Sequence, residues 1–285
     1  MKIFLKSRTF PAMKYNDYFY RCIQRKGSFL CTGIDPNPEK LPDGFSKDVQ
    51  GIYEFVREVI RVTADLTPAY KFNLAFFELW GWKGLQILEK LLSEVPQEIL
   101  LLADAKRGDI GNSSKFYAKA LLEEMPFHSA TVSPYLGSDS IRPFIEDEKK
   151  GAFVLCVTSN SSGRELQEHG APQPLYLKTA QIVQNLNDKK NLGLVMGATK
   201  PEQLLDVRKQ FPELPFLIPG VGSQGGGVET AVAVCRDNGL GLINVSRGIL
   251  YPLKGKFPDN VRAAAVHYQQ LFKLQRKIYE PYIQH

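Results

Sequence analysis

Residues 99–107 read ILLLADAKR, an apolar run that ends in charged side chains. The apolar half is typical of a parallel strand covered on both faces, whereas Asp104 and Lys106 are costly to bury unless they are paired. Side chains alternate along a strand, so Asp104 and Lys106 share one face and can meet. We therefore interpret the segment as a buried strand whose carboxyl end carries a charged site.

The same kind of run recurs along the chain, with helical segments between the runs. The other runs are SFLCTGID (28–35), AYKFNLAFF (69–77), HSATVSPYL (128–136), GAFVLCVTS (151–159), LGLVMGAT (192–199), PFLIPGVG (215–222) and GLINVSRGI (241–249). Between them, apolar stripes at helical spacing predict amphipathic helices. The stripes are Val49, Ile52, Val56 and Val59, and then Leu85, Leu88, Leu92 and Val95.

Eight strands, each followed by a helix, predict an α/β fold of the (β/α)8 TIM-barrel type, with an open doubly wound sheet as the alternative. No linker or low-complexity tract divides the chain, so we expect one domain over residues 1–285. We expect residues 1–25 to form an N-terminal helical cover.

The composition argues against several classes of protein. No apolar run approaches the ~18 residues of a membrane span, and MKIFLKSRTF (1–10) lacks a signal-peptide core, so we expect a cytoplasmic protein without membrane contact. The four cysteines form no CxxC pair and the four histidines show no ligand spacing, which argues against disulfides and a metal site. The net charge of +6 is spread along the chain and predicts a solvated surface rather than nucleic-acid binding.

In a TIM barrel, functional residues lie at the carboxyl ends of the strands. Asp35, Lys71, Asp104 and Lys106 all stand at or near such ends, and Asp109 belongs to the turn that follows. One reading of Asp104 and Lys106 is a structural ion pair. The second buried lysine, Lys71, favours a functional cluster in which each charge is compensated.

A second set of residues suggests a phosphate site. The stretch GVGSQGGG (220–227) follows one strand and precedes a helix, so its backbone N–H groups and the helix N-terminus can converge on an anion. A glycine-rich turn can also serve tight geometry alone. Its place after the seventh strand, with Arg247 after the eighth, matches the usual phosphate site of these barrels.

Seven segments at the ends of expected strands form an ordered set. They are CTGIDPNPEKLP (31–42), YKFNLAFFE (70–78), LLADAKRGDIGNSS (101–114), CVTSN (156–160), MGATKPEQL (196–204), PGVGSQGGG (219–227) and NVSRG (244–248). Together they resemble the orotidine 5′-phosphate decarboxylases, in the longer-chain group that includes many bacterial enzymes. The sequence departs from the family pattern at Phe72 and Ser161, where relatives have proline, and at Ser113, where they have threonine.

The resemblance implies metal- and cofactor-independent decarboxylation of orotidine 5′-phosphate to uridine 5′-phosphate. Lys106 would protonate the ring carbon, with Asp104, Lys71 and Asp109 flanking it as the remaining catalytic charges. The implied substrate-binding residues are Asp35, Asn73, Ile110, Ser113, Ser159, Gln224, Gly225, Arg247 and Gly248. Asp35 and Lys71 would contact the ribose, Ser159 or a neighbouring hydroxyl in 158–162 the pyrimidine, and Gln224 and Arg247 the phosphate.

The resemblance further implies a homodimer with shared sites, in which Asp109 and Ile110 enter the neighbouring subunit's site. We expect the segment 160–175 to close over the bound ligand. Two alternatives remain open. One is a magnesium-dependent sugar-phosphate decarboxylase or synthase that keeps the Asp-x-Lys-x-x-Asp segment, and the other is a noncatalytic nucleotide-binding barrel.

Overall fold

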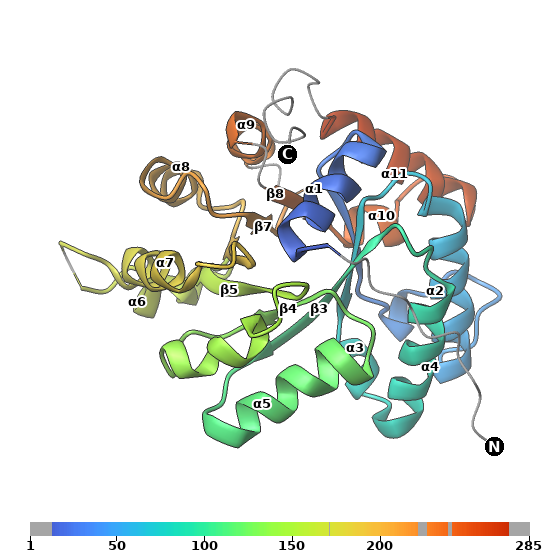
Figure 1. Cartoon of the computed structure of the whole chain (residues 1–285). Coiled ribbons are helices and arrows are strands. Elements are labelled where there is room, and N and C mark those ends of the chain that lie inside the picture. Colours follow the sequence, from blue (N-terminus) through green and yellow to red (C-terminus); the bar gives the residue numbers. More distant parts are fainter. Residues whose placement is uncertain (1–12, 171, 222–226, 239–240, 274–285) are drawn as a thin grey trace.

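The computed structural model describes residues 13–170, 172–221, 227–238 and 241–273, and its centre is a closed barrel of eight parallel strands (Figure 1). The strands are β1 (Leu30–Ile34), β2 (Ala69–Asn73), β3 (Leu100–Arg107), β4 (Ser129–Val132), β5 (Gly151–Val157), β6 (Leu192–Met196), β7 (Phe216–Ile218) and β8 (Gly241–Val245). Each strand pairs with the next, and β8 pairs with β1, where Cys31 lies opposite Asn244. The closure confirms the TIM barrel and rules out the open sheet.

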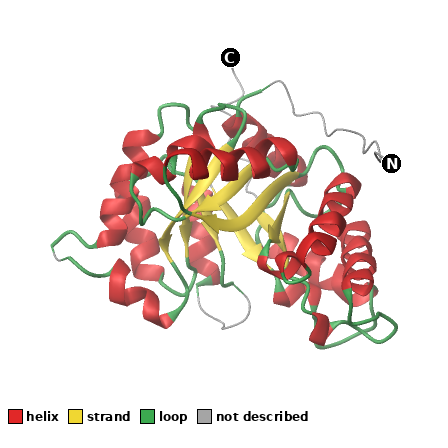
Figure 2. Cartoon of the chain, turned by 90° about the horizontal axis from the view of Figure 1, so that it is seen from below, coloured by secondary structure: helices red, strands yellow, loops and turns green. Residues whose placement is uncertain are grey.

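Helices are arranged around the outside of the barrel of strands (Figure 2). The longer ones are α2 (Val49–Thr63), α4 (Gly81–Glu94), α5 (Gly111–Lys119), α7 (Leu175–Leu186), α8 (Pro201–Gln210), α9 (Val228–Asn238) and α11 (Asp259–Leu271). Since both faces of the sheet are covered, β1, β6 and β8 are buried along their whole length.

The two predicted helical stripes differ in outcome. In α2 the stripe is confirmed, because Ile52, Val56 and Val59 are all fully buried. The side chain of Asp48 starts this helix by accepting hydrogen bonds from the backbone N–H groups of the first turn. In α4 the prediction is wrong at Leu85, whose side chain is exposed. The apolar residues that this helix buries are Ile87, Leu88, Leu91 and Leu92.

Two connections also differ from the expected pattern. The run 69–77 is not one strand: β2 ends at Asn73, and the short helix α3 (Ala75–Glu78) follows. Between β4 and β5 the chain forms two 3-10 turns, η3 (Ser138–Ser140) and η4 (Arg142–Ile145), instead of an α-helix. Pro134, Gly137 and Pro143 interrupt this short connection, and each residue type disfavours a continuous helix.

The helix α1 (Tyr15–Lys26) lies across the end of the barrel at which the strands begin. The Tyr15 hydroxyl donates to Ser129 Oγ, at the first residue of β4, over 3.0 Å, and the Tyr18 hydroxyl donates to the Gln97 carbonyl over 2.7 Å. Of the N-terminal helical cover expected over residues 1–25, the described part shows a helix over 15–26. Residues 1–12 of the expected cover lie outside the described part. Within the described part, no helix is long and apolar enough to cross a membrane.

Candidate active site

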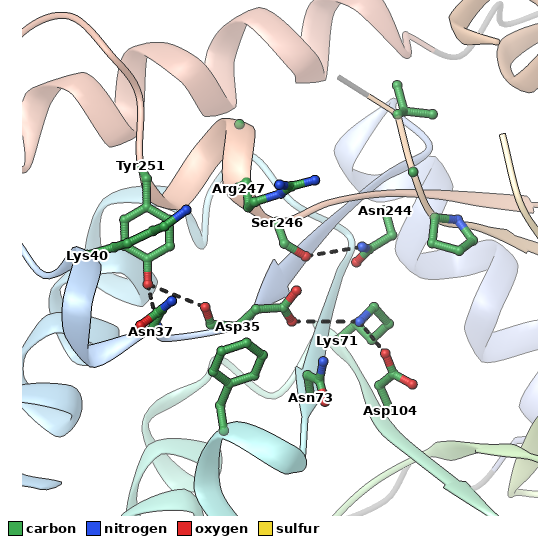
Figure 3. Close-up of a pocket in the computed structure, with 15 residues that line it drawn as sticks. Asp35, Asn37, Lys40, Lys71, Asn73, Asp104, Asn244, Ser246, Arg247 and Tyr251 are labelled. Atoms are coloured by element: carbon green, nitrogen blue, oxygen red, sulfur yellow. Dashed lines mark hydrogen bonds and ion pairs between the residues drawn. The ribbon is translucent and has the colours of Figure 1, made fainter. Parts of the chain in front are cut away.

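A cavity of about 370 Å³ opens at the carboxyl ends of the strands, the end opposite α1 (Figure 3). Its volume lies within the range of small-molecule sites. It is lined by residues of β2, β3 and β8 and by residues that follow β1, β2, β7 and β8. The polar lining includes the predicted residues Asp35, Lys71, Asn73, Asp104 and Arg247. The charges of the strand ends therefore lie around one space.

Asp104 links the two lysines into one ion network. Its Oδ2 accepts a hydrogen bond from Lys71 Nζ over 2.7 Å, and its Oδ1 accepts one from Lys106 Nζ over 2.6 Å. Lys71 Nζ also lies 3.9 Å from Asp35 Oδ1. The side chain of Lys71 is only 4% exposed and that of Asp104 11%, whereas Lys106 is 51% exposed. Lys106 is therefore half exposed and does not itself line the cavity, which its ammonium group borders through the bond to Asp104, while the other two charges are enclosed.

The network keeps both buried groups ionised. Burial by itself would raise the pKa of Asp104, but the ammonium groups of Lys71 and Lys106 outweigh it and hold that pKa well below its ordinary value. Burial would likewise lower the pKa of Lys71, but the carboxylates of Asp35 and Asp104 raise it above the ordinary value. Asp104 and Lys71 are therefore both charged at neutral pH although both are enclosed.

The opposite side of the cavity carries a second cationic region. Arg247 and Gly248 begin the short helix α10 (Arg247–Leu250), and Lys40 ends the 3-10 turn η1 (Pro38–Lys40). The Tyr251 hydroxyl accepts a hydrogen bond from the backbone N–H of Asn37 over 2.7 Å and joins the loop after β1 to the end of α10. Burial raises the pKa of Tyr251 to about 12, so the hydroxyl stays protonated at neutral pH.

The glycine at position 33 makes room for this side of the cavity. A Cβ atom there would lie 2.0 Å from Ser246 Oγ and 2.9 Å from Asn244 Oδ1. Only glycine lets both polar side chains of the β8 end reach the space beside β1. Asn244 is 6% exposed and donates to Ser246 Oγ over 3.3 Å. Figure 3 marks this bond with a dashed line.

Several predicted residues lie outside the cavity. Asp109 is half-buried and accepts a hydrogen bond from the Ile110 N–H, and Ile110 is 59% exposed on the turn before α5. Ser113 is exposed in the first turn of α5. Within one chain these three do not join the lining of the cavity. Gln224 and Gly225 lie outside the described residues.

Ser159 lies beside the cavity without lining it. A Cβ on the lining residue Gly220 would lie 3.5 Å from Ser159 Cβ. The neighbouring hydroxyl of Thr158 donates to Asn160 Oδ1 over 2.6 Å, and Ser162 Oγ accepts from Asn160 Nδ2 over 3.0 Å. Among the hydroxyl residues of 158–162, Ser159 is the one that these contacts place next to a cavity residue. Closure of the segment 160–175 stays a prediction.

The sequence reading missed several polar residues around the site. They are Asn37, Lys40, Asn244, Ser246 and Tyr251, which line the cavity, and Thr131, which bonds to Asp104. The period-2 alternation of INVSRG (243–248) could have placed Asn244 and Ser246 on the inner face with each other. Lys40 and Tyr251 lie in loops, where no periodicity indicates direction. Among the residues that the structure describes, no three His, Cys, Asp or Glu side chains are grouped to hold a metal ion.

Fold and site together define a barrel enzyme whose polar centre is a lysine–aspartate network rather than a histidine- or cysteine-based nucleophile. Residues 28–252 match the orotidine 5′-phosphate decarboxylase / HUMPS family. The chain belongs to this family.

Individual relatives agree with this assignment. A protein of Dehalococcoides mccartyi strain CBDB1, named orotidine 5′-phosphate decarboxylase, is 42% identical over 275 residues, covering 91% of this chain and all of the relative. One of Herpetosiphon aurantiacus with the same name is 42% identical over 244 residues, covering 84% of this chain and 90% of the relative. Among solved structures, a putative orotidine-monophosphate decarboxylase of Toxoplasma gondii superposes with a TM-score of 0.82 at 34% identity, covering 90% of this chain and 94% of that one.

Proposed function

We propose that this protein converts orotidine 5′-phosphate into uridine 5′-phosphate and carbon dioxide in pyrimidine biosynthesis, without a metal or organic cofactor. We further propose that it acts in the cytoplasm as a single barrel domain over residues 1–285. The observation that carries the proposal is the network of Lys71, Asp104 and Lys106 at the barrel mouth, in a chain of this family.

The chemistry explains the need for a fixed cation. Decarboxylation breaks the bond between C6 of the pyrimidine and the carboxylate carbon, and the electron pair stays in an sp² orbital that the ring cannot delocalise. An ammonium group held beside C6 stabilises that charge as it develops. In this proposal Lys106 supplies the ammonium group and then donates its proton to C6.

Asp104 has a positioning role toward Lys106. The 2.6 Å hydrogen bond from Lys106 Nζ to Asp104 Oδ1 restrains a side chain that is otherwise half exposed. Lys71 bonds to the other oxygen of Asp104, so the carboxylate cannot turn away without breaking an enclosed ion pair. The Lys71 charge also keeps Asp104 ionised when the substrate carboxylate approaches.

The rest of the cavity is suited to the nucleotide. We assign Asp35 and Lys71, which line the cavity together with Asn73, to the ribose hydroxyls. Arg247 offers a guanidinium group for the phosphate, next to the backbone of Gly248, and we assign Gln224 and Gly225 to the same end. Ser159 is proposed for the pyrimidine edge. Binding energy from the phosphate end then helps to hold C6 against Lys106.

We also propose a homodimer in which Asp109, Ile110 and Ser113 complete the neighbouring subunit's site. The exposed apolar side chains near the mouth support this. They are Leu79 and Trp82 after β2, Ile110 and Phe116 after β3, and Tyr135 and Leu136 after β4. Exposed apolar side chains gathered at one end of a barrel are a common feature of association sites.

The proposed function is tested by the loss of orotidine 5′-phosphate absorbance with purified protein in EDTA. The unmutated protein should consume the substrate, and Lys106→Ala should be at least ~10³-fold slower, because it loses both charge stabilisation and the proton donor. Lys209→Ala is the matched control, since Lys209 is exposed on α8 and distant from the mouth. It should retain full activity.

The alternatives give different results in the same assay. Absence of turnover by a folded, dimeric protein would contradict the proposal. Turnover of a keto-sugar phosphate that requires added Mg²⁺ would then favour the sugar-phosphate branch. Tight binding of uridine 5′-phosphate with no turnover of either substrate would favour a noncatalytic barrel.

A further inference from the structure

The end of β3 carries a bulge at the position of the two catalytic candidates. Ala103 pairs with Ala130 on β4, and the next pair is Arg107 with Val132, so residues 104–106 lie opposite Thr131 alone. Within the bulge, Lys106 has a φ of 46°, in the left-handed region that a lysine rarely adopts. A strained backbone of this kind persists only when its surroundings hold it in place.

The side chain of Thr131 bonds to all three residues of the bulge. Its Oγ1 accepts hydrogen bonds from the backbone N–H of Ala105 over 3.1 Å and of Lys106 over 2.9 Å. The same hydroxyl donates to Asp104 Oδ1 over 3.0 Å. A hydroxyl has one donor and two acceptor sites, so this one is fully used. Thr131 is 1% exposed, so water cannot replace these bonds without entering the barrel.

We infer that Thr131 is a positioning residue for Lys106, and this inference rests on the proposed function. Its hydroxyl fixes the left-handed backbone from which the Lys106 side chain starts. It also orients the carboxylate oxygen of Asp104 to which Lys106 Nζ is bonded. Thr131 therefore controls both ends of the lysine, the main chain and the ammonium group.

The inference predicts which step is affected. Asp35 and Arg247, which we assign to the ribose and the phosphate, make no hydrogen bond to Thr131 among the bonds of the described residues. Loss of the hydroxyl should therefore leave nucleotide binding intact and displace only the proton donor. A small displacement of a reacting group is enough for a large loss of rate.

Three variants test this. Thr131→Val keeps the shape and removes the hydroxyl, and Thr131→Ser keeps the hydroxyl. Thr179→Val removes a buried hydroxyl on α7 that donates to the Leu175 carbonyl in its own helix. We expect Thr131→Val to lower kcat ~100-fold while KM and the affinity for uridine 5′-phosphate change less than ~3-fold. Thr131→Ser should recover kcat to within ~5-fold of the unmutated protein, and Thr179→Val should match it.

Amide hydrogen exchange in the ligand-free protein gives a readout that needs no activity. The amides of Ala105 and Lys106 should exchange at least ~10-fold faster in Thr131→Val, and stay protected in Thr131→Ser. If the unmutated protein shows no turnover, the proposed function fails, and the exchange result still decides whether Thr131 holds the bulge. If Thr131→Val does not fold, Thr131→Ala replaces it in both measurements.

Three results would overturn the inference. The first is a kcat of the hydroxyl-free variant within ~3-fold of the unmutated value. The second is a loss of kcat that Thr131→Ser fails to recover, which would assign the effect to packing. The third is unchanged exchange of the Ala105 and Lys106 amides without the hydroxyl.

Discussion

Replacing Asp104 by asparagine should destabilise the fold much more when Lys71 is present than when Lys71 has been replaced by methionine. Asp104 accepts hydrogen bonds from Lys71 Nζ at 2.7 Å, Lys106 Nζ at 2.6 Å and Thr131 Oγ1 at 3.0 Å. In Asp104→Asn, the almost fully buried ammonium group of Lys71 keeps only the carboxylate of Asp35, at 3.9 Å. An enclosed charge that loses its closest partner is expensive.

The size of the effect follows from these contacts. Removing one partner of a buried ion pair costs about 3–5 kcal/mol, so we expect Asp104→Asn to lower the free energy of unfolding by that amount. Lys71→Met leaves Asp104 with Lys106 and Thr131 and should cost about 2–3 kcal/mol. In the double variant neither buried charge remains. Its decrease in the free energy of unfolding should be smaller than the sum of the decreases in the two single variants by about 2–3 kcal/mol.

Denaturant unfolding at pH 7 measures this cycle. The three variants and the unmutated protein are unfolded in urea, and the slopes are compared to ensure that the surface exposed on unfolding is the same. If the decreases in unfolding free energy of the two single variants add up to that of the double variant within about 0.5 kcal/mol, Lys71 and Asp104 are not energetically coupled. That result would refute the prediction.

Further predictions concern pH, substrate binding and the dimer. The folded-state pKa of Asp104 lies well below its unfolded value of ~3.9, so its stabilisation is fully present above that pH and is lost progressively as the pH falls from there to the folded-state pKa. Unfolding free energies of the unmutated protein and Asp104→Asn should therefore begin to converge below pH ~4. Tyr251→Phe removes the hydroxyl bond to the Asn37 N–H and should raise KM ~3–10-fold with little change in kcat, measured in steady state. Mixing inactive Lys106→Ala and Asp109→Asn subunits should restore about a quarter of native activity, because half of the dimers then hold one intact shared site; no recovery after subunit exchange would contradict shared sites.

Much of the barrel could be predicted from the sequence, because strands covered on both faces leave a long apolar signal. All eight runs contain a barrel strand. The meeting of Asp104 with Lys106 followed from the two-residue period, and it holds even though the strand bulges there. The contact between Lys71 and Asp104 followed from the predicted barrel, in which β2 and β3 are neighbours. Asn73 pairs with Asp104 across these strands, and Lys71 lies two residues before Asn73.

The features that escaped prediction depend on three-dimensional context. Leu85 fits an apolar stripe by spacing, but the packing of α4 buries Ile87, Leu88, Leu91 and Leu92 and leaves Leu85 exposed. Thr131 is one of several small polar residues in a strand, and only the bulge of β3 makes its hydroxyl important. Tyr251 reaches the cavity from the loop after α10, where no periodic pattern gives a direction.

The most direct test of the account is the turnover of orotidine 5′-phosphate in D₂O, followed by proton NMR with the unmutated protein and with Lys106→Ala. We expect the unmutated protein to form uridine 5′-phosphate with deuterium at C6 and to release one carbon dioxide per substrate. Lys106→Ala should form this product at least ~10³-fold more slowly. Product formation by Lys106→Ala within ~10-fold of the unmutated rate would contradict the assignment of Lys106 as the proton donor.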